Sequence, residues 1–300
     1  MVYIKVVRKL LLALVLCVFL APLARPQDYR IIYELQSQYQ FITVLDTPNG
    51  YRELIFDFDG TLDSSDCVQS EMKLSDPLEL SMPYVRHIMA ALPLVKNPQH
   101  ILIIGLGGAS MQRYLYRLLP DAIIETAELD PAVVKVATSY FFFKEDARQI
   151  VHTGDGRKFI ENSKDKYDII FLDAFSATAI PYQLSTREFL EVIKDHLVPG
   201  GIVCANLWEF LPEYRDMLKT YATVFAELHL LKCPYSGGNV ILVANPDKAG
   251  LSAQTWMDKA RTFERLYQTG LNLPRLIESS IADALPDLSK AKVLLDNKQR

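Results

Sequence analysis

Cysteine and histidine are scarce in this sequence, and neither residue type is grouped. Four cysteines and five histidines are spread over 300 residues, without a CxxC pair, an HExxH motif or a Cys/His cluster. A structural or catalytic zinc site needs several such ligands at short spacings, and a disulfide framework needs paired cysteines. The sequence therefore gives little support to either, and we expect no metal.

Basic blocks, internal repeats and low-complexity tracts are missing as well. The net charge is −4, from 32 Lys and Arg against 36 Asp and Glu, and beyond the N-terminus Lys and Arg form no block. Nucleic-acid binding needs a basic surface, so we expect no nucleic-acid partner. Half of the residues are apolar and 23% are charged, a balance typical of a globular protein with a sizeable core. A mildly acidic protein suits cationic substrates such as amines.

The N-terminus differs from the rest of the chain. Three basic residues precede an apolar run from Leu10 to Leu23, and Arg25 and Pro26 follow it. This order is typical of a secretory signal, and the run also approaches the roughly 20 residues of a membrane-spanning helix. We expect residues 1–27 to be a signal peptide or membrane anchor, which predicts an exported or membrane-attached protein; without that role the protein would be cytoplasmic.

Two patterns follow one another along the remaining chain. Short strand-like segments and one helix-like segment occupy residues 28–95, which predicts a small β-rich region with a linking helix. Over residues 96–250, apolar strand-like runs alternate with amphipathic helices, as in a parallel sheet covered on both faces. We therefore expect an α/β fold with a doubly wound, Rossmann-like domain there, and a helical C-terminal region over residues 251–300.

Two of the loops that follow strand-like runs carry residues suited to a nucleotide. In doubly wound sheets, ligands bind at the carboxyl ends of the strands. The loop 105–110 is rich in glycine, so a ligand can approach its backbone and the N–H groups of the following helix, although a simple tight turn would look the same. Glu128, roughly 20 residues further on, is placed to accept hydrogen bonds from ribose hydroxyls. Asp130, two residues further on, can belong to the same site or serve only as the N-cap of the following helix.

Two further loops add carboxylates. Asp155 lies between Gly154 and Gly156, where it can meet an exocyclic amine such as adenine N6 or form an ordinary turn. Asp173 closes a strand-like run of apolar residues, and at that strand end it would face the reaction crevice. The four loops together predict a nucleotide site more specifically than any one of them does.

These pieces together resemble the catalytic domain of spermidine synthases, the polyamine aminopropyltransferases. The matching stretches are Ile-Ile-Gly-Leu-Gly-Gly, Ala-Glu-Leu-Asp-Pro, Thr-Gly-Asp-Gly-Arg-Lys-Phe and Tyr-Asp-Ile-Ile-Phe-Leu-Asp, and similarity extends roughly from Tyr39 to Asn245. The resemblance implies a domain of the S-adenosylmethionine-dependent methyltransferase type. It also implies transfer of an aminopropyl group from decarboxylated S-adenosylmethionine, a co-substrate, to a small-molecule amine, with no tightly bound cofactor. The family further implies a homodimer.

The resemblance also assigns residues to roles. By this resemblance, Asp173 would be the catalytic carboxylate that orients the attacking amine and helps to deprotonate it. Glu128 would bind the ribose of the donor. The other contacts to the donor would come from Gln69, Gly105, Gly107, Gly108, Asp155 and Gly156. The amine site would be lined by Tyr84, Ser176 and Tyr235. An amine that attacks a carbon beside a sulfonium expels a neutral leaving group, so the site must supply alignment and an unprotonated nucleophile.

Two positions depart from the family and leave alternatives open. Gly108 stands where the family usually has an Asp that recognises the donor's ammonium group, and Ser176 stands where it usually has a second acid. Without the loop acid, ordinary S-adenosylmethionine enters more easily. A methyltransferase on the same scaffold and a non-catalytic nucleotide-binding homologue therefore remain alternatives.

A separate motif suggests a different enzyme class. The segment 54–63 resembles the first motif of haloacid-dehalogenase-type phosphatases, in which Asp57 would be the nucleophile and Asp59 the general acid, with magnesium. This interpretation requires the strand that carries Asp57 to begin a doubly wound domain.

Overall fold

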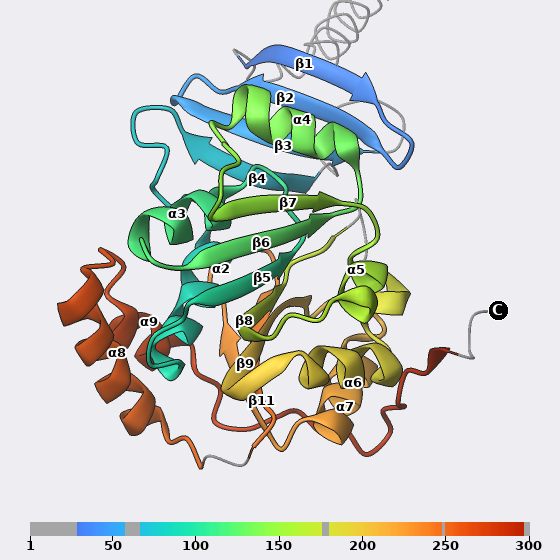
Figure 1. Ribbon diagram of the computed structural model, residues 1–300, viewed down its shortest axis with the longest axis vertical. Helices are drawn as coiled ribbons and strands as arrows, with labels where there is room; N and C mark the ends of the chain where they lie inside the picture. Colours follow the sequence, from blue (N-terminus) through green and yellow to red (C-terminus); the bar gives the residue numbers. More distant parts are fainter. Residues whose placement is uncertain (1–28, 58–66, 176–179, 248–249, 297–300) are drawn as a thin grey trace, which may run out of the picture.

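The computed structural model describes residues 29–57, 67–175, 180–247 and 250–296 and contains two sheets (Figure 1). The smaller sheet is antiparallel and follows the chain order β1-β2-β3-β4. The turn between its second and third strands contains Gly50 at φ 81°, in the left-handed region that glycine tolerates best. The strands are β1 (Arg30–Gln36), β2 (Phe41–Asp46), β3 (Tyr51–Asp57) and β4 (Cys67–Lys73).

The larger sheet has seven strands in the order β10-β11-β9-β8-β5-β6-β7. Its five parallel strands are β5 (His100–Ile104), β6 (Ile123–Glu128), β7 (Gln149–Thr153), β8 (Tyr167–Leu172) and β9 (Leu197–Trp208). Two antiparallel strands, β11 (Asn239–Asn245) and β10 (Glu227–Lys232), complete one edge. From β5 the chain builds first toward β7 and then, through β8, in the opposite direction. This reversal creates the switch point at which doubly wound sheets bind ligands, and the predicted α/β, Rossmann-like fold is confirmed.

Helices cover both faces of the large sheet (Figure 1). One face is covered by α2 (Pro83–Ile88), η1 (Met89–Leu94), α3 (Ser110–Leu118), α8 (Ala253–Tyr267) and α9 (Leu273–Ser280). The other is covered by α5 (Gly156–Asn162), α6 (Arg187–Asp195) and α7 (Tyr214–Val224), and the short helix η2 (Tyr182–Leu184) also packs there. Successive β5 residues alternate between the two cores: Ile101 and Ile103 enter one, and Leu102 and Ile104 enter the other. This alternation explains why β5 is apolar from Ile101 to Ile104.

The helix α4 (Pro131–Tyr140) joins the two sheets. It lies against the small sheet in Figure 1, and its residues Val133, Val136 and Ala137 share a core with Ile42 and Leu54 of that sheet. Because α4 follows β6 and precedes β7, this shared core holds the small sheet beside that edge of the large sheet.

The phosphatase interpretation of segment 54–63 is wrong. Asp57 ends β3, which pairs antiparallel with β2 and β4 in the small sheet. It therefore does not begin a doubly wound domain, which that chemistry requires. Asp59 lies outside the described residues.

The expected signal or anchor segment, residues 1–27, also lies outside the described residues. Among the helices that the structure describes, none combines the length and apolar character needed to cross a membrane. The role of the N-terminal segment stays a prediction.

A buried carboxylate on β6 links three neighbouring strands. Glu125 bonds through one oxygen to His100 Nε2 and through the other to His152 Nε2, both at 2.6 Å. The bond to His100 lowers the pKa of Glu125, and the same bond raises the pKa of His100. The carboxylate stabilises the fold above its ordinary pKa of 4.5, and the imidazolium does so below its ordinary pKa of 6.5.

We therefore expect Glu125→Gln to lower the Tm most between these two values, by about 4 °C near pH 5.5, which corresponds to 1–2 kcal/mol. Thermal unfolding at pH 5.5 and pH 8.5 measures the effect, which should be smaller at the higher pH. The exposed Glu191 provides a matched control, and Glu191→Gln should leave the Tm unchanged. An equal loss at both pH values would contradict the charged His–Glu pairing.

Candidate active site

A cavity of about 250 Å³ opens at the carboxyl ends of β5, β6 and β8. We call it the central pocket. It brings together eight of the residues predicted from sequence: Gln69, Tyr84, Gly105, Gly107, Glu128, Asp155, Gly156 and Asp173. These residues come from β4, α2 and four strand ends, so the fold unites segments more than 100 residues apart.

Among the described residues that line the central pocket, every ionisable side chain other than a tyrosine is acidic. They are Glu128, Asp130, Asp155 and Asp173, and this lining includes no Lys, Arg or His. Such a surface attracts cations and repels anions. The pocket is therefore suited to a cationic ligand.

Gly105 allows the glycine loop and the loop after β8 to touch. Its φ is 109°, and a Cβ at this position would lie 2.2 Å from the carbonyl oxygen of Asp173. The Asp173 N–H donates to the Ile104 carbonyl at 2.9 Å, which fixes the contact from the other side. Any larger residue at position 105 would push Asp173 away from its place in the pocket.

Glu128 ties the end of β6 to the glycine loop. Its carboxylate accepts the Leu106 N–H at 2.9 Å and the Asp130 N–H at 2.8 Å. Burial raises the pKa of Glu128 to about 7, and the backbone donors only partly offset this effect. Each oxygen keeps a lone pair for a further donor, so the side chain can accept hydrogen bonds from a diol in the pocket.

Asp155 and Asp130 both cap helices. Asp155 accepts the N–H groups of Arg157 and Lys158 at the start of α5, and Asp130 accepts the Ala132 N–H at the start of α4. The cap interpretation of Asp130 is therefore correct, yet Asp130 also lines the central pocket. Gly156 permits the approach of α5, because a Cβ there would lie 2.7 Å from Ile104.

Asp173 is held on both carboxylate oxygens. Asn206 Nδ2 donates to Oδ1 at 3.0 Å, and the Tyr84 hydroxyl donates to Oδ2 at 3.3 Å. Burial raises the pKa of Asp173, while the two donors act in the opposite direction. A carboxyl group with a raised pKa that is still held by donors is suited to accept a proton near neutral pH.

Comparison with known proteins connects this geometry to a family. Residues 82–243 match the spermine/spermidine synthase domain. The polyamine aminopropyltransferase of Vibrio vulnificus is 37% identical over 239 residues, which cover 78% of each chain. The chain belongs to the spermine/spermidine synthase family. The family recognised from the sequence motifs is thereby confirmed.

Further relatives of this spermidine synthase family member point in two directions. Spermidine synthase from Thermotoga maritima shares the fold, with a TM-score of 0.64 and 20% identity over 87% of this chain and 86% of the other. The bovine eEF1A lysine and N-terminal methyltransferase is 31% identical over 209 residues, which are 63% of this chain and 30% of the methyltransferase. The scaffold is thus similar to both aminopropyltransferases and methyltransferases.

Two predicted site residues of this family member do not line the central pocket. Gly108 is buried behind the pocket wall, where its N–H donates to Ser70 Oγ at 2.8 Å. A Cβ at position 108 would lie 2.8 Å from Ser70 Cβ and 3.0 Å from the Phe141 ring, so an acidic side chain has no room there. Tyr235 is 99% exposed in the turn before β11. The prediction that it lines the amine site is not supported, and Ser176 lies outside the described residues.

Sequence reasoning missed residues that reach the pocket from other elements. Tyr39 and Gln40 come from the turn between β1 and β2, and Phe56 comes from β3. No local pattern connects them to the strand ends of the large sheet. Asn206 was visible as the polar residue that closes an apolar run, a signal like that of Asp173. Its role became clear only from its bond to Asp173.

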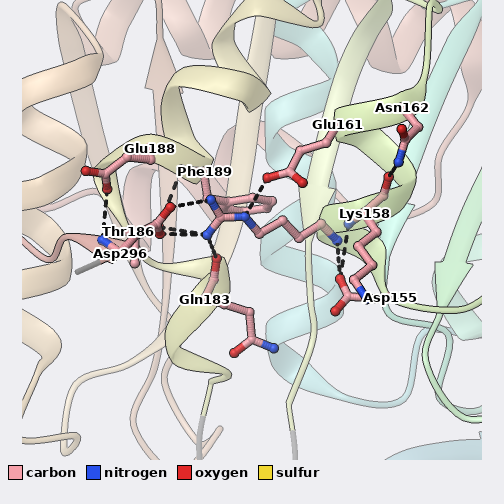
Figure 2. Close-up of polar contacts among 10 residues, drawn as sticks. Asp155, Lys158, Glu161, Asn162, Gln183, Thr186, Glu188, Phe189 and Asp296 are labelled. Atoms are coloured by element: carbon pink, nitrogen blue, oxygen red, sulfur yellow. Dashed lines mark hydrogen bonds and ion pairs between the residues drawn. The ribbon is translucent and has the colours of Figure 1, made fainter. Parts of the chain in front are cut away.

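The helix α5 is anchored by the side chain of Arg157 (Figure 2). The guanidinium forms two bonds to the Asp296 carboxylate, at 2.7 and 2.6 Å, and donates to the Gln183 carbonyl at 3.1 Å and to Thr186 Oγ1 at 3.3 Å. Gln183 lines the central pocket, and Asp155 begins the same helix as Arg157. This contact therefore connects the C-terminal segment to two sides of the pocket.

We expect Arg157→Met to lower the Tm by about 5 °C, because a bidentate ion pair and two carbonyl or hydroxyl contacts are lost together. Differential scanning calorimetry measures the shift. The matched control is Arg187→Met, since Arg187 is more exposed and its ion pairs are 3.6 Å long. Equal Tm values for both variants would mean that the Arg157 network does not anchor α5.

Proposed function

We propose that this transferase moves an aminopropyl group from decarboxylated S-adenosylmethionine to a small-molecule amine. The observation that carries the proposal is Asp173, a buried carboxylate held by Tyr84 and Asn206 at the end of β8, in a pocket whose described ionisable lining is acidic. A donor with a sulfonium and an ammonium group fits this charge. The matches to polyamine aminopropyltransferases and the fold shared with a spermidine synthase bound to the transition-state analogue AdoDATO support it.

The site residues divide the work of binding. We assign the donor's ribose to Glu128, its adenine amine to Asp155, and its remaining contacts to Gln69 and the backbone of Gly105 and Gly107. Gly156 lets α5 approach closely. The donor is a co-substrate, so no tightly bound cofactor takes part. The positions of these residues around one cavity support the assignments, which the family resemblance suggests.

The chemistry follows from charge and alignment. The acceptor's nitrogen forms a bond to the aminopropyl carbon beside sulfur, the carbon–sulfur bond breaks, and sulfur leaves as the neutral thioether of methylthioadenosine. A free amine has a pKa near 10, on the scale of lysine, so the acceptor arrives protonated. The Asp173 carboxylate receives that proton, and Tyr84 lines the approach to it.

Product analysis tests the proposal. The purified protein is incubated with decarboxylated S-adenosylmethionine and a set of mono- and diamines, and the products are separated by mass. We expect methylthioadenosine and an aminopropylated amine in equal amounts. Absence of both with every amine would refute the proposal.

A methyltransferase is the second candidate. It is supported by the relatives that methylate eEF1A and by human methyltransferase-like protein 13, whose structure with S-adenosylhomocysteine shares 26% identity and a TM-score of 0.58 over 62% of this chain. The acid that would disfavour the carboxylate of ordinary S-adenosylmethionine has no room at Gly108. Formation of S-adenosylhomocysteine from ordinary donor would favour this candidate. A nucleotide that binds without either product would indicate a non-catalytic homologue.

We further propose a homodimer, as in the family that the motifs indicate, and attachment to a membrane or export through residues 1–27. The dimer rests on the family resemblance and the N-terminal role on the sequence pattern. Light scattering of protein lacking residues 1–27, and fractionation of cells that produce the full chain, test the two proposals separately.

A further inference from the structure

Three polar side chains form a row across three neighbouring strands beside the central pocket. Asp173 directly follows β8, Asn206 lies near the end of β9, and Asn239 begins β11. Leu172 pairs with Ala205 in the parallel register, so Asp173 and Asn206 are neighbours. Asn239 pairs with Trp208, two residues from Asn206 and on the same face of the sheet.

The row gives the Asn206 amide one orientation. Its Oδ1 accepts a hydrogen bond from Asn239 Nδ2 at 2.9 Å, and its Nδ2 donates to Asp173 Oδ1 at 3.0 Å. A reversed amide would place its oxygen against the carboxylate and its NH₂ group against another NH₂ group, so both contacts would be lost. Asn206 is only 3% exposed, and water therefore does not compensate for a reversal.

The two oxygens of Asp173 are held unequally. Oδ1 receives the 3.0 Å bond from Asn206, whose amide is fixed in turn, whereas Oδ2 receives the 3.3 Å bond from Tyr84. Tyr84 is neutral, since burial and the nearby carboxylate raise the pKa of its phenol. An incoming amine can therefore replace the longer contact more easily than the shorter one.

We propose that Asn206, oriented by Asn239, is a positioning residue that fixes Oδ1 of Asp173 and leaves Oδ2 to receive the proton of the acceptor amine. The inference rests on the proposed function and deepens it, since it assigns the proton to one oxygen and extends the machinery to β11. Neither asparagine is among the described residues that line the central pocket, so both act through Asp173.

The surroundings of Asp173 decide what the loss of Asn206 does. Tyr84 faces it from α2 and Cys204 from β9, and the carboxyl groups of Glu128 and Asp155 line the same pocket. None of these groups is cationic, so Asn206 and Tyr84 are the donors that keep the charged form of Asp173 stable. Removal of one hydrogen bond to a buried carboxylate raises its pKa by about one unit.

The test combines a direct titration with kinetics on the full chain. The Asp173 carboxyl carbon is observed by NMR in protein labelled with ¹³C-aspartate, and its signal is assigned by its loss in Asp173→Asn. We expect Asn206→Leu to raise the pKa of Asp173 by about one unit, with the acid limb of kcat/KM moving upward equally. Asn239→Leu should give a smaller shift of the same sign, because the freed amide still donates part of the time.

The control is Asn245→Leu at the other end of β11, which should move neither value. A pKa of Asp173 that is unchanged in folded Asn206→Leu and Asn239→Leu overturns the inference. If Asn206→Leu fails to fold, Asn239→Leu at the strand end decides alone. The NMR titration needs no turnover, so a wild-type protein without transferase activity would refute the proposed function while the positioning role could still be measured.

Discussion

Asp173→Asn is expected to lower kcat for aminopropyl transfer by about 10³-fold, within the range that general base catalysis supplies. The amide has the shape of the carboxylate and can keep the Asn206 bond to its oxygen, but it cannot accept a proton from the ammonium form of the acceptor. The acceptor then reacts only through its small unprotonated fraction. Steady-state formation of methylthioadenosine measures the change.

The pH dependence separates a lost base from a damaged site. With Asp173→Asn, the remaining rate should rise about tenfold per pH unit on the alkaline side, as the free amine becomes more abundant. Binding of methylthioadenosine, followed by calorimetry, should stay within about threefold of wild type, since Asp173 does not hold the adenosine. The exposed Asp165 provides the matched control, Asp165→Asn, with unchanged kinetics. A kcat within tenfold of wild type would remove Asp173 from the proposed mechanism.

The sequence predicts the strand-end residues of the pocket because one rule brings them together. In a parallel sheet the carboxyl ends of neighbouring strands share an edge, so residues that close apolar runs become neighbours without any knowledge of packing. Gly105, Glu128, Asp155 and Asp173 all follow this rule and all line the central pocket. The reversal of strand order between β5 and β8 then places Asp173 beside the glycine loop.

Other parts of the site depend on contacts that leave no local pattern. Gly108 looks like a ligand-facing glycine, yet Ser70 on β4 and Phe141 after α4 occupy the space next to it. Tyr235 follows β10, the edge strand of the large sheet, but its backbone adopts φ 64° in a turn, and the side chain is exposed to solvent. The environment of Gly108 is set by how the small sheet packs, and that of Tyr235 by the turn between β10 and β11. Residue spacing along the chain predicts neither.

Asn206 lies between these two cases. It closes an apolar run just as Asp173 does, so its place at the pocket edge follows from the strand pattern. Its chemical role depends on Asn239, which lies on the antiparallel strand β11, 33 residues later in the chain. The position of Asn206 can therefore be predicted from sequence, but its role in orienting Asp173 is seen only from its hydrogen bonds to Asp173 and Asn239.

Glu128 gives the second large effect, because its ionisation should control donor binding. Burial raises the pKa of Glu128 to about 7, so in the free protein the carboxylate fraction rises from about a tenth at pH 6 to about nine-tenths at pH 8. The folded protein keeps this proton up to about pH 7, whereas the unfolded chain loses it near the ordinary pKa of 4.5. The ligand-free protein should therefore lose stability as the pH rises from 4.5 to about 7. Two ribose hydroxyls that donate to the ionised form offset this cost.

We therefore expect the affinity for methylthioadenosine, whose own charge is constant over this range, to increase about tenfold from pH 6 to pH 8. Calorimetric titration at the two pH values measures it. Glu128→Gln should weaken binding about 100-fold at pH 8, the loss expected for hydrogen bonds to a charged acceptor, and should abolish the pH dependence. The exposed Glu278 serves as the control, since Glu278→Gln leaves both the affinity and its pH dependence intact. If the affinity of folded Glu128→Gln still depends on pH, another carboxylate of the pocket is the group that titrates. The assignment of the ribose to Glu128 would then be wrong.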